Sequence, residues 1–199
     1  MDEFRLSCYG HYLHCICSLI FSRLTMTIKN KLKKTVLATL LLAPLSTAWA
    51  APLPETAQLD VELSLPKIET SMYARPYVAV WIENSERKPV RTMQLWVGKD
   101  EWLKDLRSWW RKVGRYDREL VDAVTSATRP VGEYRFSWDG LDDKGNRVEQ
   151  GDYTFYVEVV REHGGRNYLR QKLTLGESAV SHVLAPTQET GTIKINYKL

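Results

Sequence analysis

Short segments with a two-residue period constrain the fold of this chain more than any other feature. Such alternation of apolar and polar residues is typical of strands that bury one face. A near-continuous apolar run over residues 77–83 predicts a central strand of a sheet. The other predicted strands cover residues 59–65, 90–97, 134–138, 153–159, 167–175 and 193–199. Short strands at this spacing predict an all-β fold in which two sheets pack face to face.

One segment changes period and predicts a helix. Apolar residues recur with helical spacing over residues 102–113, which is the pattern of one amphipathic helix. Asp100 is its expected N-cap and Gly114 its expected C-cap. The predicted fold is therefore an immunoglobulin-like β-sandwich over residues 59–199, with a short helical insertion at about residues 100–121.

The start of the chain has the three parts of a secretory signal peptide. Residues 29–34 are basic, and residues 35–42 form an apolar run that is too short to span a membrane comfortably. Small residues stand at Ala48 and Ala50, where a signal peptidase reads the chain. We therefore expect cleavage before Ala51, a periplasmic location and a mature form without a membrane anchor.

The leader also carries the three cysteines. We expect translation to begin at Met26, so that residues 1–25 are an upstream extension from an incorrect start and residues 26–50 are the signal peptide. The Pro-containing residues 51–58 are expected to be a tether. A mature chain without cysteine excludes disulfides, thiol redox chemistry and cysteine metal sites.

The basic charge of the full chain comes from the leader. Six of the 28 Lys and Arg and two of the 24 Asp and Glu lie in the first 50 residues, which leaves 22 of each. A net charge of zero gives no indication of nucleic-acid binding. Motifs of hydrolases, nucleotide-binding proteins and metalloproteases do not occur, and His163 and His182 are too few for a metal centre. These observations make a hydrolase, a nucleotide-binding protein or a metalloprotease the less favoured functions.

The most patterned segment lies between two predicted strands. Residues 138–153 are rich in Asp and Gly, and they resemble the Ig-like module of the flagellar hook-capping protein. Asp and Asn bond their own backbone in turns, whereas the spacing of the carboxylates is not that of an EF-hand. The segment therefore predicts a turn and supports the fold rather than a calcium site.

A second motif carries the functional prediction. Residues 122–128, in a predicted loop over residues 122–130, are similar to the acceptor motif Asp-x-x-Ser/Thr-x-Ala-Thr of proteins that carry covalent FMN. The resemblance implies that a flavin transferase esterifies FMN to Thr128 and that Asp122 helps it recognise the loop. Ser126 stands where Gly is usual. The remaining motif positions are Thr125 and Ala127.

Several nearby residues are candidates for contact with a flavin. Arg129 or Arg135 can pair with its phosphate, and Trp109 or Trp110 can stack on its ring. His163, in a predicted Gly-Gly hairpin turn, can touch the flavin, bind a metal or move a proton. Each has a structural alternative: the tryptophans as core residues, the arginines as solvated surface and the histidine as a turn residue.

The order of these motifs resembles one family. The signal peptide is followed by Thr-Ser-Ala-Thr-Arg-Pro-Val-Gly-Glu-Tyr, Trp-Asp-Gly-Leu-Asp, Gly-Asp-Tyr and Arg-Glu-His-Gly-Gly. With these motifs, the chain is similar over most of residues 77–175 to a predicted periplasmic family, domain of unknown function 2271. Association of that family with flavin transferases and PepSY-type membrane proteins implies an extracytoplasmic electron carrier with FMN on Thr128. The alternative is a cofactor-free Ig-like binding or scaffolding module.

Overall fold

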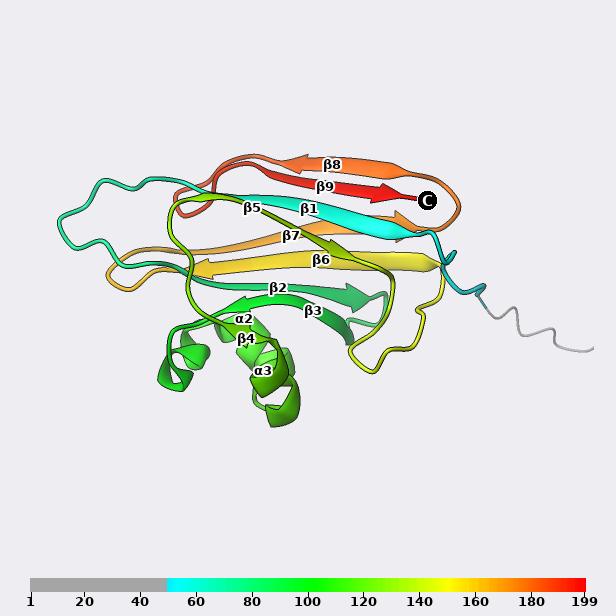
Figure 1. Ribbon diagram of the computed structural model, residues 1–199, viewed down its shortest axis with the longest axis horizontal. Helices are drawn as coiled ribbons and strands as arrows, with labels where there is room; N and C mark the ends of the chain where they lie inside the picture. The colour runs from blue at the N-terminus through cyan, green and yellow to red at the C-terminus, as the bar shows by residue number, and fades with distance from the viewer. Residues whose placement is uncertain (1–49) are drawn as a thin grey trace, which may run out of the picture. The chain divides into compact units, whose positions relative to one another are not determined.

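The computed structural model describes residues 50–199, which form two sheets packed face to face (Figure 1). One sheet has the order β5 (Gly132–Trp138), β1 (Gln58–Leu65), β9 (Ile193–Lys198), β8 (Val180–Leu184). The other has the order β4 (Thr125–Ser126), β3 (Pro89–Trp96), β2 (Tyr77–Asn84), β6 (Gly151–Val160), β7 (Arg166–Leu175). Neighbours are antiparallel except β3 and β4. The predicted all-β, immunoglobulin-like sandwich is confirmed. The predictions for residues 1–49 lie outside the described residues.

The alternation in the sequence matches burial in the structure. In β1 every second residue, from Leu59 to Leu65, is buried between the sheets. In β2 seven consecutive residues are buried because both faces of the strand are covered. Val78 and Val80 face the other sheet, whereas Ala79 and Trp81 pack beneath the helical insertion. The prediction of a central strand is therefore confirmed.

One predicted alternation, in β3, is wrong. Alternation along the predicted strand over residues 90–97 puts Met93 and Leu95 on one face, but Met93 packs into the core between the sheets and Leu95 packs beneath the helices. The cause is a bulge: Val80 of β2 pairs with Gln94, whereas the next residue, Trp81, pairs with Thr92. The extra residue reverses the side-chain alternation along the rest of the strand.

The predicted single helix is also wrong. The insertion consists of a 3₁₀ helix η1 (Asp100–Asp105), a short α2 (Arg107–Trp109), a π-helical turn η2 (Trp110–Gly114) and α3 (Arg118–Val124). Leu106 leaves helical geometry at φ −76° and ψ 65°. The buried residues Leu103, Leu106 and Trp109 are three apart, which is the 3₁₀ period rather than the α period.

The expected caps have different roles. The N-cap of η1 is Lys99, and it makes no side-chain cap bond, so Asp100 is not the cap. Gly114 ends η2, but it is required for space: a Cβ there would lie 2.6 Å from Trp110 and 2.7 Å from Trp109. Asp117 caps α3 by accepting a 2.9 Å hydrogen bond from the Leu120 N–H.

Two buried carboxylates hold the insertion to the second sheet. Glu158 of β6 accepts hydrogen bonds from the backbone N–H groups of Ser108 (3.0 Å) and Trp109 (2.9 Å), and from the Arg166 guanidinium (2.8 Å). Glu83 of β2 accepts from Trp81 Nε1 at 2.8 Å, and its other oxygen pairs with Lys112 at 2.6 Å. Because both carboxylates are fully buried, their positions fix the helices on the sheet.

The segment over residues 51–58 is docked on the domain, so the tether prediction is wrong. The Leu53 N–H donates to the Val148 carbonyl at 2.8 Å, and the Gln150 N–H donates to the Ala51 carbonyl at 2.7 Å. The Leu53 side chain is 2% exposed and belongs to the main core. The apolar Leu53 side chain explains the docking, because the free energy gained by burying it exceeds the conformational entropy that a free linker would keep.

Leu53→Ala is expected to lower the free energy of unfolding by about 3 kcal/mol, since it removes a buried side chain and leaves a cavity. Chemical denaturation of the mature protein measures this change. Leu199→Ala is the control because Leu199 is 48% exposed, and its effect should stay within about 0.5 kcal/mol. Equal effects of the two substitutions would show that the segment is not docked.

Candidate functional site

The Asp122–Thr128 motif spans three kinds of structure rather than one loop. Residues 122–124 are the last turn of α3, and residues 125–126 form β4, so the predicted loop begins only at residue 127. β4 runs parallel to the end of β3, with Thr125 opposite Leu95 and Ser126 opposite Trp96. The motif thus connects the helical insertion to β5 of the other sheet.

Two of the three hydroxyl groups in the motif have structural partners. Thr125 Oγ1 donates to the Val121 carbonyl at 2.6 Å, which closes the end of α3. Ser126 Oγ donates to the Leu95 carbonyl at 3.3 Å, and the Val97 N–H donates to the Ser126 carbonyl at 2.9 Å. The motif is therefore attached to the edge of β3 up to Ser126.

Thr128 follows this attachment and is half-buried, between exposed Ala127 and Arg129. Within residues 50–199, its hydroxyl has no hydrogen-bond partner. The hydroxyl that the resemblance designates is thus the one that the local structure leaves unused. Nothing in this geometry opposes its role as an acceptor, and that role stays a prediction.

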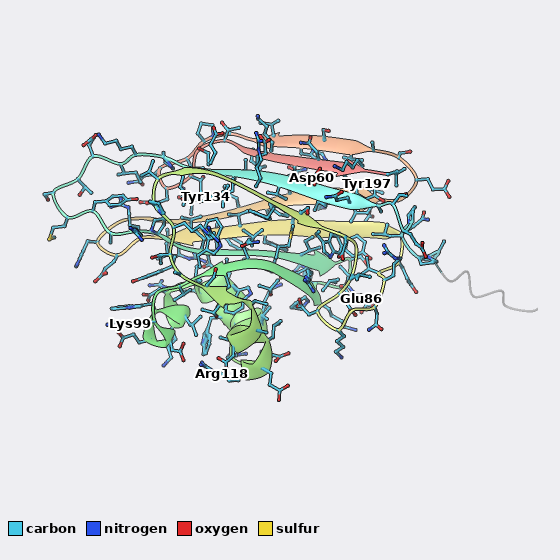
Figure 2. The ribbon with its side chains drawn as sticks, in the orientation of Figure 1. Asp60, Glu86, Lys99, Arg118, Tyr134 and Tyr197 are labelled. Atoms are coloured by element: carbon cyan, nitrogen blue, oxygen red, sulfur yellow. The ribbon has the colours of Figure 1, made fainter. Side chains whose placement is uncertain are left out.

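Arg129 lies against two aromatic rings. Its guanidinium carbon is 5.2 Å from the centre of the Trp96 ring and 5.6 Å from that of Tyr134. The two rings meet edge to face at 5.0 Å, and the Tyr134 hydroxyl donates to the Pro130 carbonyl at 2.6 Å. Cation–π contacts of this kind orient a cation without neutralising it. Figure 2 labels Tyr134 toward the end of the sandwich where this loop lies.

Asp122 is exposed on α3 and pairs with Arg118 one turn earlier, at 2.9 Å. Arg118 also pairs with Asp100 of η1, so it links the two ends of the insertion. The Asp122 carboxylate remains accessible from solvent. Asp122, the first residue of the motif, therefore lies on a helix rather than in the predicted loop.

Three of the residues proposed to contact a flavin have structural roles instead. Trp109 is fully buried, and its Nε1 donates to Thr92 Oγ1 at 3.1 Å, so it is a core residue and not a flavin-stacking one. Trp110 is half-buried in the same cluster. Arg135 pairs with Glu62 of β1 at 2.9 Å. The structural alternatives for these residues account for their contacts.

His163 is in the β6–β7 hairpin turn, in the left-handed region at φ 56°. It is exposed, and its Nε2 is 3.7 Å from the Glu162 carboxylate. The hairpin and the Thr128 loop are at the same end of the second sheet, because Tyr77 pairs with Val160 and Val78 with Trp96. Among residues 50–199, no group of three metal-ligating side chains is close enough to hold a metal ion.

The sequence did not reveal the buried ion pair beside this hairpin. Arg161 Nε donates to Glu189 Oε2 at 2.9 Å, and both side chains are at most 5% exposed. The Gly165 N–H donates to Glu189 Oε1 at 2.6 Å. A Cβ on Gly164 would lie 2.6 Å from the Arg161 guanidinium, and one on Gly165 would lie 2.7 Å from Glu189. The Arg-Glu-His-Gly-Gly motif therefore makes room for an ion pair, and its glycines were the available signal.

A groove of about 760 Å³ lies between the helical insertion and the 139–149 turn. Burial raises the pKa of Asp143, which accepts a hydrogen bond from the Thr92 N–H, and raises the pKa of Tyr153 to about 12. Asp142 Oδ1 accepts from the Lys144 and Asn146 N–H groups, as expected of a turn. The groove lining includes Lys112, Tyr116, Leu120, Asp143, Lys144 and Tyr153.

The match to a family model agrees with the motifs. The family model described as "Predicted periplasmic protein (DUF2271)" matches residues 58–192. Among solved structures, the chain is similar to truncated FlgD from Helicobacter pylori, at 20% identity and a TM-score of 0.30, over 66% of this chain and 74% of that one. None of the curated proteins matches the chain significantly. Within residues 50–199, no helix has the length and apolar character needed to span a membrane.

Proposed function

The chain belongs to the family of predicted periplasmic proteins known as DUF2271, and from this premise we propose that it is a periplasmic electron carrier with FMN esterified to Thr128. Export would proceed through the signal peptide with cleavage before Ala51. A flavin transferase would attach the cofactor, and a PepSY-type membrane protein would be the redox partner. Bound flavin supplies reversible electron acceptance, and the protein positions it.

The unused hydroxyl of Thr128 carries this proposal. Thr125 and Ser126 use their hydroxyls to attach the motif to Val121 and Leu95, whereas Thr128 has no partner within the described residues. Exposed residues on both sides give a transferase access to it. The residues present therefore fit an acceptor site.

Arg129 supports the proposal from the neighbouring position. A phosphate ester on Thr128 would place negative charge next to a guanidinium that has no carboxylate partner within residues 50–199. Its two aromatic contacts restrict its orientation, which lowers the entropic cost of pairing with a phosphate. His163 is at the same end of the sheet, but β3 and β2 separate its hairpin from β4, and its contact with the flavin stays a prediction.

Intact-mass measurement of the mature protein, co-produced in a periplasm with a flavin transferase, tests the proposal. We expect a gain of one FMN less one water, and its complete loss in Thr128→Ala. Ser126→Gly, which restores the usual residue of the motif, is the control and should keep the modification. An unmodified wild-type mass, with the transferase active on a known substrate, would exclude the carrier function.

The second candidate function is a cofactor-free binding module, which the 760 Å³ groove favours. Its volume is within the range of small-molecule sites, and its walls come from both the insertion and the 139–149 turn. Under this function Thr128→Ala changes nothing, and ligand binding is sensitive to substitutions at Tyr116 or Lys144 in the groove.

A further inference from the structure

The outer face of the second sheet carries an aromatic row that ends in an exposed tyrosine. Trp81 of β2 stacks on Tyr156 of β6 with ring centres 4.9 Å apart, and Tyr156 stacks on Tyr168 of β7 at 5.7 Å. Trp81 and Tyr156 are buried, but Tyr168 is 38% exposed. The row therefore reaches solvent at β7, the edge strand of the second sheet on the side opposite β4 (Figure 1).

Cations surround this tyrosine on its own strand. β7 pairs with β6 without a bulge, so Arg166, Arg170 and Lys172 share the face of Tyr168. All three are exposed, and they extend over roughly 20 Å along the strand. The Arg166 guanidinium carbon is 5.6 Å from the centre of the Tyr168 ring.

The helical insertion adds one further cation to the same face. Ser108 Oγ accepts a 2.7 Å hydrogen bond from Arg166, and Lys112 lies 5.7 Å over the Tyr156 ring. The basic face is thus defined by Lys112, Arg166, Arg170 and Lys172, with Tyr168 among them.

The two buried acidic residues of this face neutralise only two of its cations. Glu158 and Glu83 are fully buried and are paired with Arg166 and Lys112. The exposed Asp152 of β6 accepts a hydrogen bond from Thr174. Within residues 50–199, Arg170 and Lys172 form no ion pair. By contrast, cations on the outer face of the first sheet are paired: Lys194 with Glu62 and Lys198 with Asp60. The outer face of the second sheet therefore carries unpaired strand cations, although the mature chain has 22 cations and 22 anions.

We propose that the basic face binds the anionic headgroup plane of a phospholipid membrane, as a peripheral contact of the folded domain. The cations are spread along a strand and a helix rather than directed at one point, which suits a plane of phosphates better than a single small anion. An exposed tyrosine among them has the amphipathic character favoured at a membrane interface. This contact is independent of whether Thr128 carries a flavin.

Sedimentation of the mature protein with vesicles tests the proposal. The protein should bind vesicles of phosphatidylglycerol and phosphatidylcholine at low salt, but not vesicles of phosphatidylcholine alone. Binding should weaken as salt is raised, because the Debye length shortens. Arg170→Gln/Lys172→Gln should weaken binding about twenty-five-fold, since each cation near an anionic surface contributes about fivefold.

Lys194→Gln/Lys198→Gln is the matched control. It removes the same charge from strand residues of the opposite face, where each lysine already has a carboxylate partner. We expect vesicle binding close to that of the wild type. Failure of the wild type to bind anionic vesicles, or an equal loss in both double variants, would overturn the proposal. Retention on an immobilised acidic peptide without vesicle binding would also overturn it, in favour of an acidic protein partner.

Discussion

Replacing Glu189 by Gln is expected to lower the free energy of unfolding by about 4 kcal/mol, the largest effect that we predict for a single residue. Glu189 is the partner of Arg161, and both side chains are almost completely shielded from solvent. Removing one charge leaves the other buried without compensation, which costs far more than the pair contributes in net stability. The Gly165 N–H loses a charged acceptor at the same time.

A double substitution separates this explanation from simple loss of packing. In Arg161→Met/Glu189→Leu no charge remains buried, so at least half of the lost stability should return. Urea denaturation of the three variants measures the difference. Glu162→Gln, in the same hairpin but exposed, is the control and should be nearly neutral. A double variant less stable than Glu189→Gln would contradict the buried-charge explanation.

Glu158→Gln is expected to lower the free energy of unfolding by about 3 kcal/mol, as much as Leu53→Ala. Its carboxylate accepts from two backbone N–H groups of the insertion and from Arg166. Arg166 is one-third exposed, so it can recover part of its hydration, and the cost is lower than at Glu189. The backbone N–H groups of Ser108 and Trp109 have no such recourse because both residues are buried.

Hydrogen exchange gives this prediction a local measurement. The amides of Ser108 and Trp109 should exchange faster in Glu158→Gln, while amides in β1 keep their protection relative to global unfolding. Denaturation gives the total loss, with Glu162→Gln again as the control. Uniform acceleration of exchange over the whole domain would show that Glu158 stabilises the fold rather than the insertion.

The strands could be predicted because burial on one face imposes a visible period. β8 was missed, since its residues alternate only between half-buried and exposed, at the edge of a sheet, and leave a weak apolar pattern. Residues 102–113 were expected as one helix because Trp102, Leu106, Trp109 and Val113 recur with helical spacing, and this spacing does not reveal the break at Leu106 or the 3₁₀ and π-helical segments. The bulge at Met93 has no signature in the sequence, and it reverses the faces that alternation predicts.

At the candidate site, too, the sequence predicted contiguous features but not contacts between distant residues. The motif and its acceptor residue were visible because they are contiguous in sequence. The partners of Thr125 and Ser126, and the ion pair between Arg161 and Glu189, depend on residues brought together by folding. Trp109 lies on the apolar stripe that indicated a core residue, and its burial follows from that pattern.

The short connection that holds Thr128 determines how a group attached there can move. β4 belongs to one sheet and β5 to the other, and only residues 127–131 lie between them. A fully extended segment of that length reaches about 17 Å, and it is held at both ends by strands, which limits how far Thr128 can swing. A group on Thr128 therefore stays at the seam between the sheets and meets a partner by rotation and diffusion of the whole domain. Its encounter rate is set by the surface of the protein, not by the flexibility of the loop.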